Sequence, residues 1–91
     1  MTELSRSLPI INEKGLHARA SAKFVETVER FDARASVARD GLTVSGDSIM
    51  GLLMLAAAKG SDIDVKVSGN QAAELMDALA TLVGNRFGEG R

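Results

Sequence analysis

The sequence predicts one α+β domain in which a mostly antiparallel four-stranded sheet carries three helices on one face. Its 91 residues are enough for a single two-layer core, and 45% of them are hydrophobic. Apolar residues alternate in four segments and recur at helical spacing in three others, in the order β-α-β-β-α-β-α. Short connections between strands that are apolar on one side favour antiparallel pairing. We therefore expect residues 1–91 to form a single domain without linkers or internal repeats.

The first half of the chain predicts three strands and one helix. The first strand is centred on residues 8–10, and Pro9 places it at a sheet edge because proline cannot donate to a central ladder. Residues 12–15 form a turn before a helix over residues 18–31, whose apolar stripe is Ala20, Phe24, Val28 and Phe31. Residues 33–38 alternate as a strand, Asp40-Gly41 predicts a tight hairpin, and residues 42–44 return beside it.

The second half predicts two more helices with a strand between them. The second helix covers about residues 48–58, capped by Ser48 or Asp47 and closed by Lys59-Gly60. Residues 63–67 alternate as a strand with one buried face. After a turn at residues 68–70, the third helix carries one apolar stripe, formed by Ala72, Leu75, Met76, Leu79, Leu82 and Val83. The tail over about residues 84–91 is rich in glycine, and we expect it to fray.

The composition excludes several classes of function. The chain has no cysteine, which rules out disulfides, thiol chemistry and cysteine-based zinc sites. A net charge of −1 and an aromatic content of 3% argue against a nucleic-acid partner. Residues 1–7 lack the pattern of a signal peptide, and no apolar run is long enough to span a bilayer. We therefore expect a cytoplasmic protein with no membrane insertion, no metal and no cofactor.

The single histidine, His17, lies where the turn meets the first predicted helix. A helix N-terminus offers free backbone N–H groups and partial positive charge, here from Ala18, Arg19 and Ala20, and both favour an anion. The dipole and Arg19 also favour the neutral, nucleophilic imidazole. The site therefore suits acceptance of a phosphoryl group, whereas the alternatives are a surface or capping histidine and a solvated first-turn arginine.

Two motifs resemble those of HPr proteins, the histidine-containing phosphocarriers of the bacterial phosphotransferase system. The segment Gly15-Leu16-His17-Ala18-Arg19 resembles the family's phosphorylation site, and Ser48-Ile49-Met50-Gly51-Leu52-Leu53-Met54-Leu55 resembles its regulatory-serine helix. Length and element order over residues 8–83 also match. The resemblance implies the HPr-like open-faced β-sandwich.

The same resemblance implies a role in sugar transport as a stoichiometric carrier and not as an enzyme. Nδ1 of His17 would accept a phosphoryl group from phospho-enzyme I and pass it to a histidine of an enzyme IIA domain. Arg19 would stabilise charge on the moving group, since positioning and electrostatics carry most of such transfers. The chain has no P-loop, so we expect no binding of ATP. We expect the carrier to act as a monomer.

The second predicted helix is too apolar to be buried on all sides. Leu52 and Leu55 share the face that seals the sheet, and the remaining apolar residues cannot all join them. Flexible exposed methionines suit transient docking to several partners. We expect a docking surface formed by Ile49, Met50, Leu53 and Met54, together with Lys23 of the first helix. The alternative is that rotation of the helix and nearby loops bury most of these residues.

Two positions depart from the family pattern. Ala20 stands where HPr proteins usually have proline, which loosens the first helical turn and adds a backbone donor. Asp47 precedes Ser48, where a basic residue often stands. The resemblance implies that an HPr kinase/phosphorylase modifies Ser48, and the alternative is a plain helix N-cap. The sequence also leaves open a regulatory phosphocarrier of the nitrogen-type branch, and outside the family a noncatalytic α+β regulatory or ligand-binding module.

Overall fold

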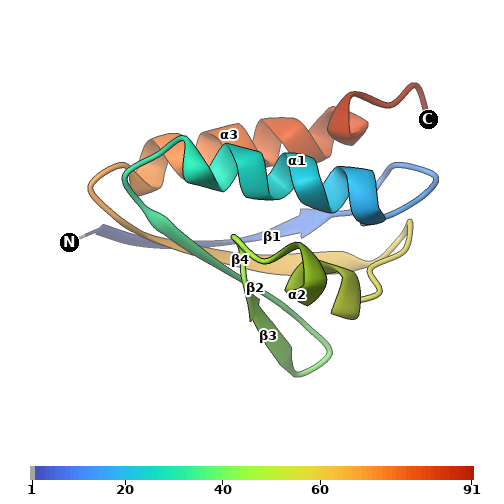
Figure 1. Cartoon of the computed structure of the whole chain (residues 1–91), viewed down its shortest axis with the longest axis horizontal. Helices are drawn as coiled ribbons and strands as arrows, with labels where there is room; N and C mark the ends of the chain where they lie inside the picture. The colour runs from blue at the N-terminus through green and yellow to red at the C-terminus, as the bar shows by residue number, and fades with distance from the viewer. Residues whose placement is uncertain (1) are drawn as a thin grey trace.

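The computed structural model describes residues 2–91 as one sheet with helices packed against it (Figure 1). The elements are β1 (Thr2–Pro9), α1 (Ala18–Glu29), β2 (Arg34–Arg39), β3 (Leu42–Ser45), α2 (Ile49–Met54), β4 (Asp62–Gly69), α3 (Ala72–Gly84) and a short 3-10 helix, η1 (Arg86–Gly88). The strand order is β1-β4-β2-β3, and every neighbouring pair is antiparallel. The predicted α+β class and element order are confirmed. No helix within residues 2–91 has the length and apolar character needed to cross a membrane.

The first strand lies at the edge of the sheet, as Pro9 predicted, but it is longer than expected. It begins at Thr2 and pairs with the whole of β4, from Thr2 opposite Gly69 to Pro9 opposite Asp62. Four of its residues, Glu3, Ser5, Arg6 and Ser7, are exposed and polar, so hydrophobic patterning gave no sign of the first part of the strand. Backbone pairing with β4 extends the strand towards the N-terminus, beyond the residues 8–10 on which the prediction was centred.

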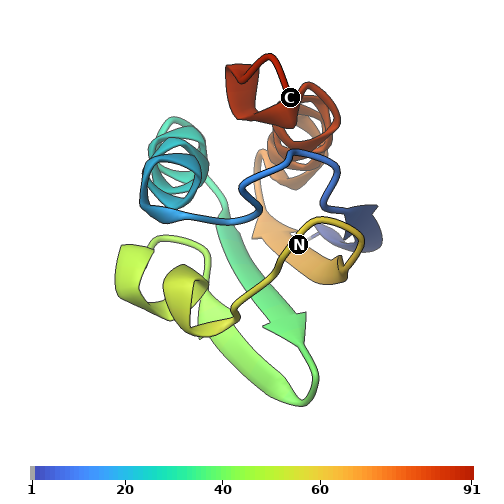
Figure 2. The ribbon, with the colours of Figure 1, turned by 90° about the vertical axis from the view of Figure 1, so that its right-hand side faces the viewer.

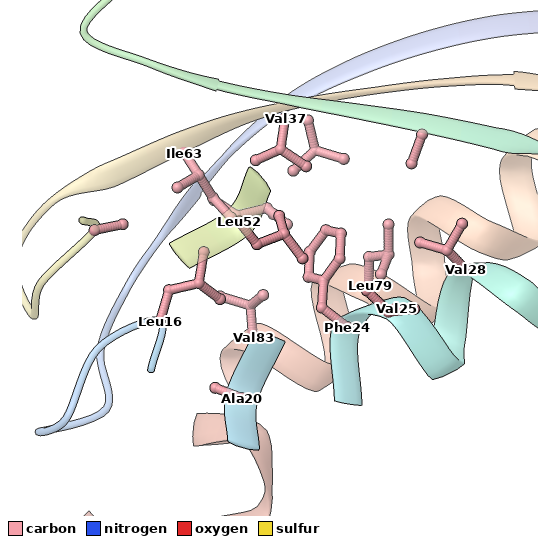
Figure 3. Packing of buried hydrophobic residues seen from close by; sticks show 14 of the residues in the cluster. Leu16, Ala20, Phe24, Val25, Val28, Val37, Leu52, Ile63, Leu79 and Val83 are labelled. Atoms are coloured by element: carbon pink, nitrogen blue, oxygen red, sulfur yellow. The ribbon is translucent and has the colours of Figure 1, made fainter. Parts of the chain in front are cut away.

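The core lies between one face of the sheet and the helices that cover it (Figure 3). Ile63, Val65 and Val67 of β4 point inward, as their alternation predicted, and are at most 1% exposed. The α1 stripe meets them through Ala20, Phe24 and Val28, while Phe31 is only partly buried. The α3 stripe completes the layer, so that α1 and α3 lie side by side over the sheet (Figures 1 and 2).

The second helix is shorter than the expected 48–58. It ends at Met54, Leu55 is its C-cap, and Ala56 adopts a left-handed backbone with φ of 50°. Leu55 and Ala57 lie beyond the helix, and both are buried. The Ala57 carbonyl accepts a hydrogen bond from Leu16 N–H at 2.9 Å. The chain therefore leaves the helix in order to pair with the loop that precedes α1.

The expectation of a frayed tail over 84–91 is wrong. Helix α3 runs to Gly84, and the chain then turns through η1, which buries Phe87 completely. Lys23 Nζ donates to the Phe87 carbonyl at 2.6 Å and ties this turn to α1. Burial of one aromatic side chain outweighs the glycine content that suggested disorder. Both views show the tail beside the loop between β1 and α1 (Figures 1 and 2).

Candidate functional site

His17 is the N-cap of α1 and lies in a loop whose path depends on Gly15. Gly15 has φ of 66°, and a Cβ built there would lie 2.6 Å from the Ala57 carbonyl oxygen. Only glycine allows the loop to pass this close to the chain that follows α2. The neighbouring hydrogen bond from Leu16 N–H to Ala57 fixes the same approach. The loop therefore delivers His17 to the helix start in a defined position.

The first turn of α1 leaves backbone donors free beside His17. The first intrahelical hydrogen bond runs from Ser21 N–H to the His17 carbonyl at 2.8 Å. The N–H groups of Ala18, Arg19 and Ala20 precede it and have no acceptor within the helix. Ala18 and Arg19 are exposed, whereas Ala20 is completely buried as a whole residue. His17 thus lies at a helix start with free backbone donors, and binding of an anion there stays a prediction.

The imidazole of His17 is in direct contact with a carboxylate from the tail. Its Nε2 meets Oε2 of Glu89, and the two side chains are 26% and 19% exposed. Asn12, which is fully buried, donates from Nδ2 to Glu89 Oε1 at 3.0 Å and to the Gly15 carbonyl at 2.8 Å. One amide thus links the histidine loop, the tail and the carboxylate on the imidazole.

The contact with His17 also sets the charge of Glu89. The hydrogen bond from His17 is the largest of the causes that hold the pKa of Glu89 below its ordinary value of 4.5. The hydrogen bond from Asn12 and the positive charge of Lys14 act in the same direction, whereas burial opposes them. Glu89 is therefore ionised at neutral pH, so this side chain is an acceptor only.

Charged side chains surround a shallow concave surface next to this contact. Glu13, Lys14, Arg19 and Arg91 line it together with Glu89 and Gly90. The Arg19 side chain is exposed, so its guanidinium is available to an anion near His17. Lys23, which was expected on the docking surface, is partly buried, and its ammonium donates a hydrogen bond to the Phe87 carbonyl.

Helix α2 exposes most of the apolar residues predicted for docking. Met50 and Met54 are 70% and 65% exposed, Ile49 is 40% exposed, and Leu53 is partly buried. Leu52 is fully buried beneath them, as predicted. Helix α2 lies beside the N-terminal half of α1, the helix that His17 caps (Figures 1 and 2).

Ser48 is the N-cap of α2. Its hydroxyl accepts a hydrogen bond from Gly51 N–H at 3.0 Å. Asp47 does not cap the helix, because its carboxylate accepts from Ser45 Oγ at 2.6 Å. Of the two candidate caps, Ser48 and Asp47, the helix is therefore capped by Ser48. Ser48 directly precedes Ile49, the first residue of the exposed apolar surface.

Comparison with known proteins identifies the family. Residues 4–85 match the sequence model described as the phosphorylation site of the phosphotransferase system HPr component. This chain belongs to the HPr family. The phosphocarrier protein HPr of Neisseria meningitidis serogroup A is 49% identical over 96% of this chain and 98% of its own length. HPr from Cupriavidus necator is 47% identical over the same shares.

Solved HPr structures share the fold. A crystal structure of HPr from Thermoanaerobacter tengcongensis superposes with a TM-score of 0.89 at 34% identity, covering 100% of both chains. HPr from Bacillus anthracis gives a TM-score of 0.85 at 36% identity, over 91% of this chain and 99% of the other. The resemblance based on the two motifs is therefore confirmed, and the chain is a phosphocarrier of the bacterial phosphotransferase system.

Sequence reasoning missed Asn12 and Glu89 in this HPr site. The sequence places Asn12 in the turn before α1 and Glu89 in the tail that is expected to fray. Asparagine is common in turns, so nothing local marked Asn12 as buried. The one available signal for Glu89 was Phe87, an isolated aromatic residue in a glycine-rich segment, whose burial brings the carboxylate to His17.

Proposed function

We propose that this chain carries a phosphoryl group on Nδ1 of His17, from phospho-enzyme I to a histidine of an enzyme IIA domain. The supporting observation is that His17 begins α1 beside backbone N–H groups that have no intrahelical acceptor. Membership of the HPr family supplies the two partners and the cytoplasmic setting. Each molecule gains and loses one phosphoryl group per transfer, so it acts as a carrier and not as an enzyme.

The transfer exchanges one nitrogen–phosphorus bond for another. The Nδ1 lone pair of His17 attacks phosphorus while the bond to the donor histidine breaks, and that electron pair returns to the donor nitrogen. The exposed guanidinium of Arg19 offsets charge on the phosphoryl oxygens. The N–H groups of Ala18 and Arg19, both exposed residues, donate to the same oxygens. Ala20 has an N–H that proline would lack, but the whole residue is buried.

The direct test is intact mass after incubation with phosphoenolpyruvate and enzyme I. We expect one phosphoryl group per chain, labile to acid and stable to alkali, and none on the His17→Ala variant. Arg19→Ala should remain folded and accept the group roughly tenfold more slowly, because about 1–3 kcal/mol of charge stabilisation is lost. Arg30→Ala removes the same charge at the other end of α1 and should leave the rate unchanged. Transfer to His17→Ala would refute the assignment.

The exposed apolar surface of α2 is proposed as the docking site for both partners. It consists of Ile49, Met50, Leu53 and Met54, together with Lys23 of α1, whose ammonium has donors left besides the one bound to the Phe87 carbonyl. Met50→Asp should weaken association with enzyme I and leave thermal stability nearly unchanged. Leu4→Asp, at an exposed apolar position near the start of β1, is the matched control and should bind normally. A large loss of stability in Met50→Asp would place Met50 in the core instead.

Phosphorylation of Ser48 by an HPr kinase/phosphorylase is proposed to block this docking. A phosphate adds a charge of about −1.5 to −2 next to Asp47 and the apolar surface. That surface must lose water when a partner binds, so the charge opposes binding. The Ser48-phosphorylated protein should therefore bind enzyme I more weakly and accept the phosphoryl group on His17 more slowly than the unmodified protein. Equal rates would leave Ser48 as a helix cap alone.

A further inference from the structure

We propose that Glu89 is a positioning residue that holds the His17 imidazole with Nε2 protonated and thereby makes Nδ1 the nucleophile. This inference rests on the proposed function, because it assigns Glu89 a part in the same transfer. The two residues are 72 positions apart in the chain and meet through a side-chain contact between Nε2 and Oε2. The tail is thus a component of the phosphoryl site and not only a terminus.

The tail is held firmly enough to orient the carboxylate. Phe87 is fully buried and its carbonyl accepts from Lys23 Nζ at 2.6 Å, so the chain is anchored two residues before Glu89. Glu89 N–H donates to the Arg86 carbonyl at 2.9 Å, which fixes its backbone. Buried Asn12 binds the second carboxylate oxygen. Both oxygens therefore have partners, and the carboxylate has little freedom to turn away from His17.

The protonation of the ring follows from the charge of its partner. Because Glu89 is ionised, it can only accept a hydrogen bond, and the proton in the contact must belong to His17 Nε2. A neutral imidazole carries one proton, so Nδ1 then keeps its lone pair. The contact thus selects one of two tautomers, and it does so before any partner binds.

The same contact favours the transfer itself. As the lone pair of Nδ1 forms the bond to phosphorus, positive charge spreads over the ring, and the carboxylate at Nε2 stabilises that charge. The Nε2 proton stays in place throughout, and no other proton moves. Glu89 contacts the ring at Nε2 and not at Nδ1, the nitrogen that forms the bond to phosphorus. Arg19 stabilises the negative charge on the phosphoryl oxygens, and Glu89 stabilises the positive charge on the imidazole ring.

The tautomer is measured on the unphosphorylated protein by nitrogen NMR of labelled histidine, at a pH where the imidazole is neutral. We expect a single tautomer, protonated at Nε2, in the unaltered protein and a mixture in Glu89→Ala. Glu89→Gln keeps one acceptor oxygen in place of two, so it should give an intermediate result. Glu29→Gln removes the same charge at the exposed end of α1, away from His17, and should leave the tautomer unchanged. The resonances of Phe87 report whether the tail stays docked in each variant.

The kinetic arm measures phosphorylation by phospho-enzyme I. Glu89→Ala should lower kcat about tenfold with KM little changed, as expected when one charge-assisted hydrogen bond is lost. Glu89→Gln should lower kcat less, and Glu29→Gln should match the unaltered protein. The proposal is overturned if Glu89→Ala, with its tail docked, keeps both the Nε2-protonated tautomer and the normal kcat. Absence of phosphorylation in the unaltered protein would instead refute the proposed function, whereas the tautomer measurement needs no donor.

Discussion

Replacement of Phe87 with alanine should destabilise the whole fold, although the residue lies in a glycine-rich tail. Its side chain is fully buried in the core formed by the sheet and helices. Truncation of a buried phenylalanine costs about 3–5 kcal/mol. Arg86 and Phe87 both have φ of 54°, a left-handed conformation that costs about 1–2 kcal/mol for each residue. If the tail comes free, this strain is relieved and offsets part of the loss. We therefore expect a net loss of about 2 kcal/mol, because the partners of the tail are lost as well.

Thermal unfolding followed by far-ultraviolet circular dichroism measures this loss. The chain has no tryptophan or tyrosine, so intrinsic fluorescence gives little signal. For a domain of this size, a loss of 2 kcal/mol lowers Tm by roughly 8–16 °C. Phe31→Ala is the matched control, because Phe31 is only partly buried at the end of α1 and its loss should lower Tm less. An unchanged Tm in Phe87→Ala would show that the tail adds nothing to the core.

Three further predictions concern the loop, the α2 cap and the tail contact. Gly15→Ala should lower the free energy of unfolding by about 2–4 kcal/mol in urea denaturation, since it combines a positive φ with a backbone clash. Ser48→Ala should cost about 1 kcal/mol through loss of the bond from Gly51 N–H, and phosphorylation of His17 should persist. The lowered pKa of Glu89 means that its ionised form stabilises the fold above pH 4.5, and the effect is lost as pH falls through the folded value. The stability advantage over Glu89→Gln should therefore be full at neutral pH and disappear in acid; an advantage that survives in acid would contradict the assignment.

Most of the fold could be predicted from the sequence because its elements carry regular patterns. The alternation of Ile63, Val65 and Val67 marked β4, and Asp40-Gly41 marked the hairpin, where both residues have positive φ. Side-chain periodicity is a local signal, so it needs no knowledge of partners. The early end of α2 carried no such signal, since it depends on a hydrogen bond between Leu16 and the distant Ala57.

The site divides in the same way between local and long-range features. His17 was found because its neighbours along the chain form a helix start, and the exposed Met50 was found from the periodicity of α2. Glu89 and Asn12 were missed because their roles arise from contacts across the fold. The glycines around Phe87 predicted a disordered tail, but burial of Phe87 and the hydrogen bonds of the tail to Asn12 and Lys23 hold it against the fold.

The central claim is that Nδ1 of His17 receives the phosphoryl group, and NMR of the phosphorylated protein tests it most directly. With histidine labelled by nitrogen-15, coupling to phosphorus identifies the bonded nitrogen. We predict coupling at Nδ1 of His17, with the proton retained on Nε2 beside Glu89. Phosphorus bonded to Nε2, or to a side chain other than His17, would contradict this account.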